Sequence, residues 1–91
     1  DMAAASLFVL DLDQPTYAAH TQPMLSHINV GYGDDVSIAD LARLVAEVTG
    51  FKGQLSFDSS KPDGTKQKLL DVSRLASMGW RASISLEQGV A

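Results

Sequence analysis

The residues best suited to chemistry lie in one short stretch, residues 61–68, which reads Lys-Pro-Asp-Gly-Thr-Lys-Gln-Lys. Three of the seven basic residues of the chain fall in these eight positions. Pro62 and the Asp63-Gly64 pair predict a turn here. Lysines in a turn can bind phosphate, and a carboxylate beside exposed backbone N–H groups can accept a hydrogen bond from a sugar. The stretch therefore predicts a site for an anionic ligand that carries hydroxyls. The alternative is a solvated loop between two elements.

A dinucleotide-binding loop is the other motif that the sequence brings to mind. Gly31 and Gly33 follow an expected strand, as the first glycines of such a loop do. The third glycine position is occupied by Val36, however, and Asp34 and Asp35 would repel a pyrophosphate from the next helix. A plain turn is the better interpretation, and no cofactor-binding residue is expected in this chain.

No residue set typical of catalysis or metal binding is expected either. His20 and His27 have no carboxylate at ligand spacing, and the chain has no cysteine. It also lacks a Tyr-x-x-x-Lys pair and a Gly-x-Ser-x-Gly elbow. We expect no catalytic residue and no metal site, so this chain alone should catalyse nothing.

Composition limits the size and the partners of the protein. Ninety-one residues make at most one small domain, and 45% hydrophobic residues predict a modest core. A net charge of −4 argues against nucleic acid or an anionic membrane as partner. No apolar run approaches the roughly 18 residues of a membrane span. The absence of cysteine fits a cytoplasmic origin.

The first quarter of the chain predicts one helix and a loop. Residues 2–12 are alanine-rich and apolar almost all round, with Asp1 as the expected cap. Pro15 predicts that this helix fades near residue 13, and residues 16–26 predict a loop. A helix with so little polar surface is normally buried on several sides. Together with a chain that starts at Asp1 and stops within a helical pattern, this leads us to expect a missing partner domain.

The central part predicts the fold class, a small α/β domain with one βαβ unit. Residues 27–31 and 54–58 alternate apolar and polar side chains, as short strands do. Between them Ser37 opens a capping box, and the helix from 37 to 49 should stop at Gly50. The two strands should be parallel, joined by a right-handed crossover and flanked by helices.

The last part predicts two short helices. Asp71 is the expected cap of a helix over residues 72–78, which should end at Gly79 with Trp80 packed back onto it. Ser85 begins a second capping box and opens a helix that continues to the end of the chain.

Several of these runs together resemble a known family. Thr-Gln-Pro-Met-Leu-Ser-His at 21–27, Lys-Pro-Asp-Gly-Thr at 61–65, Lys-Leu-Leu-Asp-Val at 68–72 and the Gly79-Trp80 pair closely resemble the C-terminal part of the GDP-L-fucose synthases. That family belongs to the extended short-chain dehydrogenase/reductase superfamily. The resemblance covers essentially the whole chain, and Tyr32 and residues 10–20 depart from the family pattern.

The resemblance implies a parent with two lobes. An N-terminal Rossmann domain would bind NADP(H) and carry the catalytic residues, and residues 1–91 would form most of the C-terminal lobe that binds the GDP-sugar. The parent would be a cytoplasmic homodimer that converts GDP-4-keto-6-deoxy-D-mannose to GDP-L-fucose by epimerisation and reduction. The alternatives are the substrate lobe of another nucleotide-sugar epimerase or dehydratase, and a non-catalytic small α/β binding module.

The resemblance also assigns substrate-binding residues within the lysine-rich turn. Asp63 would contact the nucleotide, with a ribose hydroxyl as the expected partner, and Lys68 would pair with the diphosphate. Lys61 is a second candidate for a phosphate contact. The choice between Lys66 and Lys68 stays open.

Overall fold

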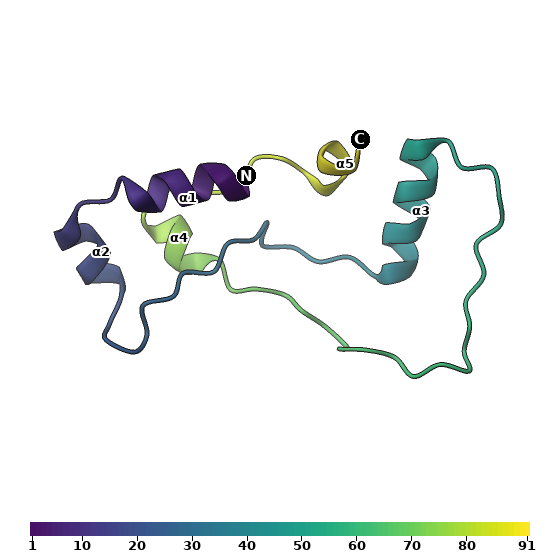
Figure 1. The fold of residues 1–91 in the computed structure, drawn as a ribbon, viewed down its shortest axis with the longest axis horizontal. Coiled ribbons are helices and arrows are strands. Elements are labelled where there is room, and N and C mark those ends of the chain that lie inside the picture. Colours follow the sequence, from purple (N-terminus) through teal and green to yellow (C-terminus); the bar gives the residue numbers. More distant parts are fainter.

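The computed structural model describes all 91 residues and contains five helices and no strand (Figure 1). The helices are α1 (Met2–Leu10), α2 (Gln14–His20), α3 (Ile38–Thr49), α4 (Ser73–Ser77) and α5 (Leu86–Val90).

The predicted βαβ unit is absent, and this part of the α/β prediction is wrong. Residues 27–31 and 54–58 carry no ladder, and the one β-bridge joins Gln22 to Leu25 within a tight turn. The two segments lie on opposite sides of the molecule, so their backbones cannot pair (Figure 1). A strand needs a neighbour to satisfy its N–H and C=O groups, and alternating side chains alone do not supply one.

Helix α1 forms near its predicted place with Asp1 at its N-cap position, but the Asp1 side chain makes no capping hydrogen bond. The Asp1 carboxylate instead accepts hydrogen bonds from the backbone N–H groups of Ser83 (3.2 Å) and Ile84 (2.8 Å). The helix ends at Leu10 rather than residue 12, and Ala5 is its one buried residue. The first residue of the chain therefore holds the segment that leads into α5.

Helix α2 replaces part of the loop predicted at 16–26. The Asp13 carboxylate accepts a hydrogen bond from the backbone N–H of Thr16 at 2.8 Å and so caps the helix. Pro15 lies in the first turn, where the missing N–H leaves no hydrogen bond unmade. Pro15 thus begins a helix as well as preventing α1 from continuing.

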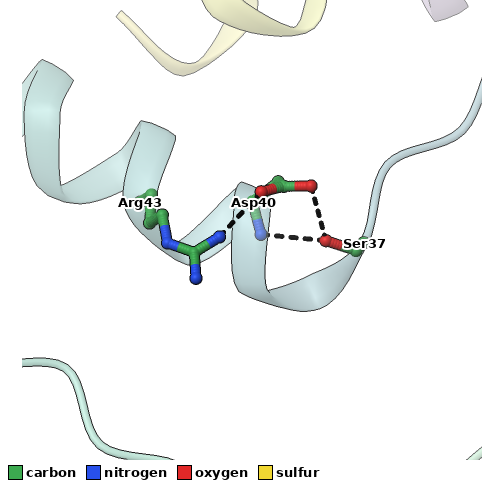
Figure 2. A network of polar contacts seen from close by, with 3 residues as sticks. All are labelled: Ser37, Asp40 and Arg43. Carbon is green, nitrogen blue, oxygen red and sulfur yellow. Dashed lines mark hydrogen bonds and ion pairs between the residues drawn. The ribbon is translucent and has the colours of Figure 1, made fainter.

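Helix α3 forms over the predicted residues, but the predicted capping box is only half formed, because the Asp40 side chain does not accept from the Ser37 backbone N–H. The Ser37 hydroxyl oxygen accepts a hydrogen bond from the backbone N–H of Asp40 at 3.0 Å and donates one to the Asp40 carboxylate at 2.8 Å (Figure 2). Arg43 adds an ion pair of 2.8 Å to that carboxylate. Gly50 ends the helix in the left-handed conformation with φ of 71°, which glycine adopts without strain.

The two C-terminal helices are short. Helix α4 runs from Ser73 to Ser77, one residue shorter than predicted at each end, and its N-cap residue is Val72 rather than the predicted Asp71. The Asp71 carboxylate still accepts a hydrogen bond from the Ser73 N–H at 2.9 Å, just before the helix. Gly79, with φ of 98°, follows the helix as predicted, and the Trp80 N–H donates to the Leu75 carbonyl at 3.2 Å. Helix α5 begins with the predicted capping box between Ser85 and Gln88.

The molecule is flat and has very little core. Its extents are 53 × 29 × 15 Å, and its two buried residues are Ala5 of α1 and Leu75 of α4. Helix α5 lies beside α3 (Figure 1). None of the helices combines the length and the apolar character needed to cross a membrane.

Residues 51–70 form what we call the exposed arc. They contain no helix or strand, every one of them is exposed, and they run around one edge of the molecule from α3 back towards α4 (Figure 1). This arc carries the lysine-rich stretch.

Candidate functional site: the lysine turn

All predicted substrate-binding residues lie in the exposed arc. Lys61, Asp63 and Lys68 are exposed, and no carboxylate oxygen lies within 4 Å of a lysine nitrogen. The single ion pair of the chain joins Arg43 to Asp40 on α3. The lysine charges of the turn are therefore not neutralised by the chain itself. We refer to residues 61–68 as the lysine turn.

A local hydrogen-bonded turn leads into the site. The Asp58 carboxylate accepts hydrogen bonds from the backbone N–H of Ser60 (3.0 Å) and from its hydroxyl (2.5 Å). The backbone N–H of Lys61 donates to the Asp58 carbonyl at 3.4 Å. The Ser60 hydroxyl, and then its N–H, lower the pKa of Asp58 below its usual 3.8. Asp58 therefore stays ionised at neutral pH and sets the chain direction just before Lys61.

The second half of the lysine turn touches the segment that precedes α3. The Gln67 side-chain amide donates to the Asp35 carboxylate at 2.6 Å. An open hollow of about 670 Å³ lies at this contact. Its lining residues are Asp35, Val36, Ser37, Thr65, Lys66 and Gln67. Lys66 thus lines this hollow, whereas Lys61, Asp63 and Lys68 do not.

A polar pocket of about 180 Å³ near the start of α4 was not predicted from the sequence. It is lined by His27, Asn29, Asp71, Ser73 and Arg74. Arg74 donates from Nη1 to the carbonyls of His27 (2.6 Å) and Leu25 (3.4 Å). Because these carbonyls lie 47 and 49 residues away along the chain, no local pattern could indicate the contact.

The hydrogen bonds of this pocket show that its polar groups hold the chain together. The Asn29 side-chain amide donates to the Asp71 carbonyl at 3.4 Å, which adds to the Arg74 contacts. The Ser73 hydroxyl and N–H lower the pKa of Asp71, with a smaller contribution from the Arg74 charge. The arginine is occupied by backbone carbonyls, so its role here is to join residues 25–29 to α4.

The residues considered for a dinucleotide loop or a metal site have roles within the fold. A Cβ atom added to Gly33, whose φ is 90°, would lie 3.1 Å from the Val72 side chain. This close approach and the positive φ account for the glycine without a ligand. His20 Nδ1 lies 2.8 Å from the Thr16 carbonyl in its own helix. No three His, Asp or Glu side chains come together in an arrangement that could hold a metal ion.

Comparison with known proteins gives the context for the lysine turn. No family model matches the chain. It is 57% identical over all 91 residues to GDP-L-fucose synthase of Escherichia coli (strain K12), and covers 28% of that protein. It is 46% identical over 91 residues to GDP-L-fucose synthase 1 of Arabidopsis thaliana, with 25% covered. A GDP-L-fucose synthase of Sinorhizobium fredii is 58% identical over 65 residues, which are 71% of this chain and 21% of that protein.

These identities confirm the resemblance that the sequence motifs indicated. The chain spans about a quarter of the length of the relatives that match it from end to end. Over its whole length, this chain is a homologue of the GDP-L-fucose synthases and corresponds to one part of them.

Proposed function

We propose that this chain is the GDP-sugar-binding part of an NADPH-dependent GDP-L-fucose synthase. Such an enzyme converts GDP-4-keto-6-deoxy-D-mannose to GDP-L-fucose by epimerisation and reduction. The observation that carries the proposal is the 57% identity over all 91 residues with the Escherichia coli enzyme. Because the chain matches 28% of that relative, the catalytic residues belong to the remainder of the parent, and this part alone is inactive.

The lysine turn supplies the chemistry for the substrate. Lys68 and Lys61 face the diphosphate, and Asp63 accepts a hydrogen bond from a ribose hydroxyl. Their exposure and the absence of an ion pair to any lysine leave the ammonium groups available. Charge-assisted hydrogen bonds of this kind contribute about 1.5–3 kcal/mol each. A site with two or three of them binds a nucleotide diphosphate with useful affinity.

NADPH is assigned to the rest of the parent, because the residues of this chain do not fit it. A dinucleotide loop needs glycines between a strand and a helix N-terminus. Gly31 and Gly33 follow no strand here and lie against the Val72 side chain. Asp34 and Asp35 come next in the chain and would repel the pyrophosphate.

The apolar surface of α1 fits a role as the contact with a Rossmann domain. Met2, Leu7 and Leu10 remain 64%, 61% and 77% exposed. Exposed apolar side chains of this size on one helix mark an interaction surface. The parent is proposed as a cytoplasmic homodimer in which this surface is covered by the N-terminal domain of the same chain.

The test uses the longer natural protein that contains this chain. Lys68→Ala and Asp63→Ala should each raise KM for the GDP-sugar about 10- to 100-fold, since one charge-assisted hydrogen bond is lost. The KM for NADPH should stay unchanged. Lys52→Ala is the matched control, because Lys52 is an exposed lysine of the same arc outside the lysine turn. A change in NADPH binding with normal GDP-sugar affinity would reverse the assignment.

A second candidate is the substrate lobe of another nucleotide-sugar enzyme. The chain is 38% identical over 68 residues to the GDP-L-colitose synthase of Yersinia pseudotuberculosis. The lower identity makes this the weaker proposal. Assays of the longer protein with several GDP- and UDP-sugars separate the two, since the leading proposal requires turnover of GDP-4-keto-6-deoxy-D-mannose.

A further inference from the structure

The exposed arc is attached to the rest of the molecule at very few points. At its start the backbone N–H of Phe51 donates to the Ala46 carbonyl of α3 at 2.9 Å. At its end Leu70 and Val72 pack against Gly31. Between residues 53 and 70, one hydrogen bond reaches a residue outside the arc, and it is the 2.6 Å bond from Gln67 to Asp35.

We propose that this hydrogen bond positions the lysine turn relative to α3, and that Gln67 and Asp35 are positioning residues for the GDP-sugar site. The proposal rests on the proposed function. Gln67 lies between Lys66 and Lys68, so a bond that fixes Gln67 also limits the positions of both lysine backbones. Neither Gln67 nor Asp35 is assigned a contact with the ligand.

The Asp35 end of the bond is itself held in place. The Asp35 N–H donates to the Asp34 carboxylate at 3.0 Å. Two residues further on, Ser37 is fixed by two hydrogen bonds to Asp40 at the start of α3 (Figure 2). The hydrogen bond from Gln67 therefore connects the lysine turn to the segment that leads into the capped N-terminus of α3.

The chemistry of the pair explains how it can position cations without neutralising them. The neutral amide of Gln67 donates to one oxygen of the Asp35 carboxylate, so this contact with the lysine turn needs no lysine as its partner. A turn that is ordered before the ligand arrives loses less entropy on binding. Loss of the bond should therefore weaken ground-state binding of the GDP-sugar and leave the chemical step alone.

The kinetic test is made in the longer natural protein. Gln67→Ala and Asp35→Ala should each raise KM for the GDP-sugar about three- to tenfold with kcat unchanged. The KM of the double variant should be no higher than that of either single variant, because both substitutions remove the same hydrogen bond. Asp35→Asn should recover most of the affinity, because its amide oxygen still accepts. Gln67→Glu should be worse than Gln67→Ala, because it places two carboxylates together.

Gln54→Ala is the matched control, since Gln54 is an exposed glutamine of the same arc without a hydrogen-bond partner. Its KM should equal that of the unchanged protein. Additive effects in the double variant, or an Asp35→Asn variant as weak as Asp35→Ala, would overturn the proposal.

A second measurement does not depend on the proposed function. These 91 residues contain no cysteine, so in the longer natural protein, with any other cysteines replaced by serine, Glu47→Cys and Gly64→Cys can carry two spin labels. A Cβ atom at Gly64 meets no atom within 4 Å, and Glu47 is exposed on α3. The distance distribution between the labels should broaden with Gln67→Ala and not with Gln54→Ala. An unchanged distribution would refute the positioning role. If the distance distribution broadens but variants of Lys61, Asp63 and Lys68 leave the KM for the GDP-sugar unchanged, the positioning role stands and the proposed function is refuted.

Discussion

Two regions of the molecule use their basic side chains in opposite ways. One is the region around α1 and α4, and the other is the exposed arc. Around α4 the arginine binds backbone carbonyls and the aspartates bind backbone N–H groups, next to the two buried residues Ala5 and Leu75. In the arc the lysines have no partner, and no side chain is buried. The comparison teaches that Arg74 is used for internal contacts near α4, while the lysines of the arc remain unpaired and available to a ligand.

The largest difference between the two regions should appear when one leucine is truncated in each. Leu75→Ala should lower the free energy of unfolding by about 2–4 kcal/mol, because Leu75 is 2% exposed and its removal leaves a cavity. Leu69→Ala in the arc should lower it by about 1 kcal/mol, since Leu69 is half exposed. Urea denaturation followed by tryptophan fluorescence measures both. Equal losses would show that the arc is as well packed as the helical region.

The next effect concerns the arginines. Arg74→Ala should destabilise the chain by about 1 kcal/mol, because two carbonyls at residues 25 and 27 lose their donor. Arg43→Ala should change stability less, since its ion pair with Asp40 is exposed on both sides. Thermal melts followed by circular dichroism compare the two variants. A larger loss of stability from Arg43→Ala than from Arg74→Ala would contradict the view that contacts around α4 hold the fold together.

A smaller and more local effect is expected at the helix that borders the arc. Ser37→Ala removes the N-cap of α3 and should destabilise that helix by about 1 kcal/mol. Amide hydrogen exchange at residues 41–44, whose N–H groups are bonded within the helix, should accelerate about fivefold, which is the equivalent factor in the opening equilibrium. Ser56→Ala in the arc has no hydrogen bond to lose and serves as control. Faster exchange in both variants would indicate a general loss of stability.

The smallest effect is a pH dependence that both regions share. Hydrogen bonds from Ser37 and then Arg43 lower the pKa of Asp40, and Ser60 lowers that of Asp58 in the arc. A carboxylate with a lowered pKa stabilises the folded state above pH 3.8, and this contribution is lost as pH falls through the lowered value. Carboxyl-carbon NMR titrations should give midpoints below 3.8 for both aspartates.

Serine variants separate the two contributions. Ser37→Ala should raise the midpoint of Asp40 alone, and Ser60→Ala should raise that of Asp58 alone. If these substitutions leave the titration midpoints unchanged, the serine hydrogen bonds are absent in solution.

Most features set by neighbours in sequence could be predicted, although the Asp13 cap of α2 was missed, and features set by distant residues could not. Three helix-end features depend only on residues close by in the sequence, and each was predicted correctly. They are the Ser37 N-cap, the Gly50 C-cap and the Ser85–Gln88 capping box. The Asp1 contact with Ser83 and Ile84 spans more than 80 positions, so the carboxylate was wrongly assigned to its own helix.

The strands illustrate the same limit. The alternation at 27–31 and 54–58 predicts which side chains share a face, but it does not show which segment would pair with each strand. In the structure neither segment has a pairing partner. The homology to the GDP-L-fucose synthases was predicted from the motifs and is confirmed by the identities. The roles of Lys61, Asp63 and Lys68 stay predictions, because they depend on a ligand and on residues outside this chain.

The position of the single tryptophan has a practical consequence. Trp80 is half-buried and shares a pocket of about 250 Å³ with Gly31, Tyr32 and Val72, at the place where the arc returns to the helices. Its emission is therefore an intrinsic optical signal for movement at that joint. Stopped-flow mixing could test whether the arc moves when a nucleotide binds, without any attached dye.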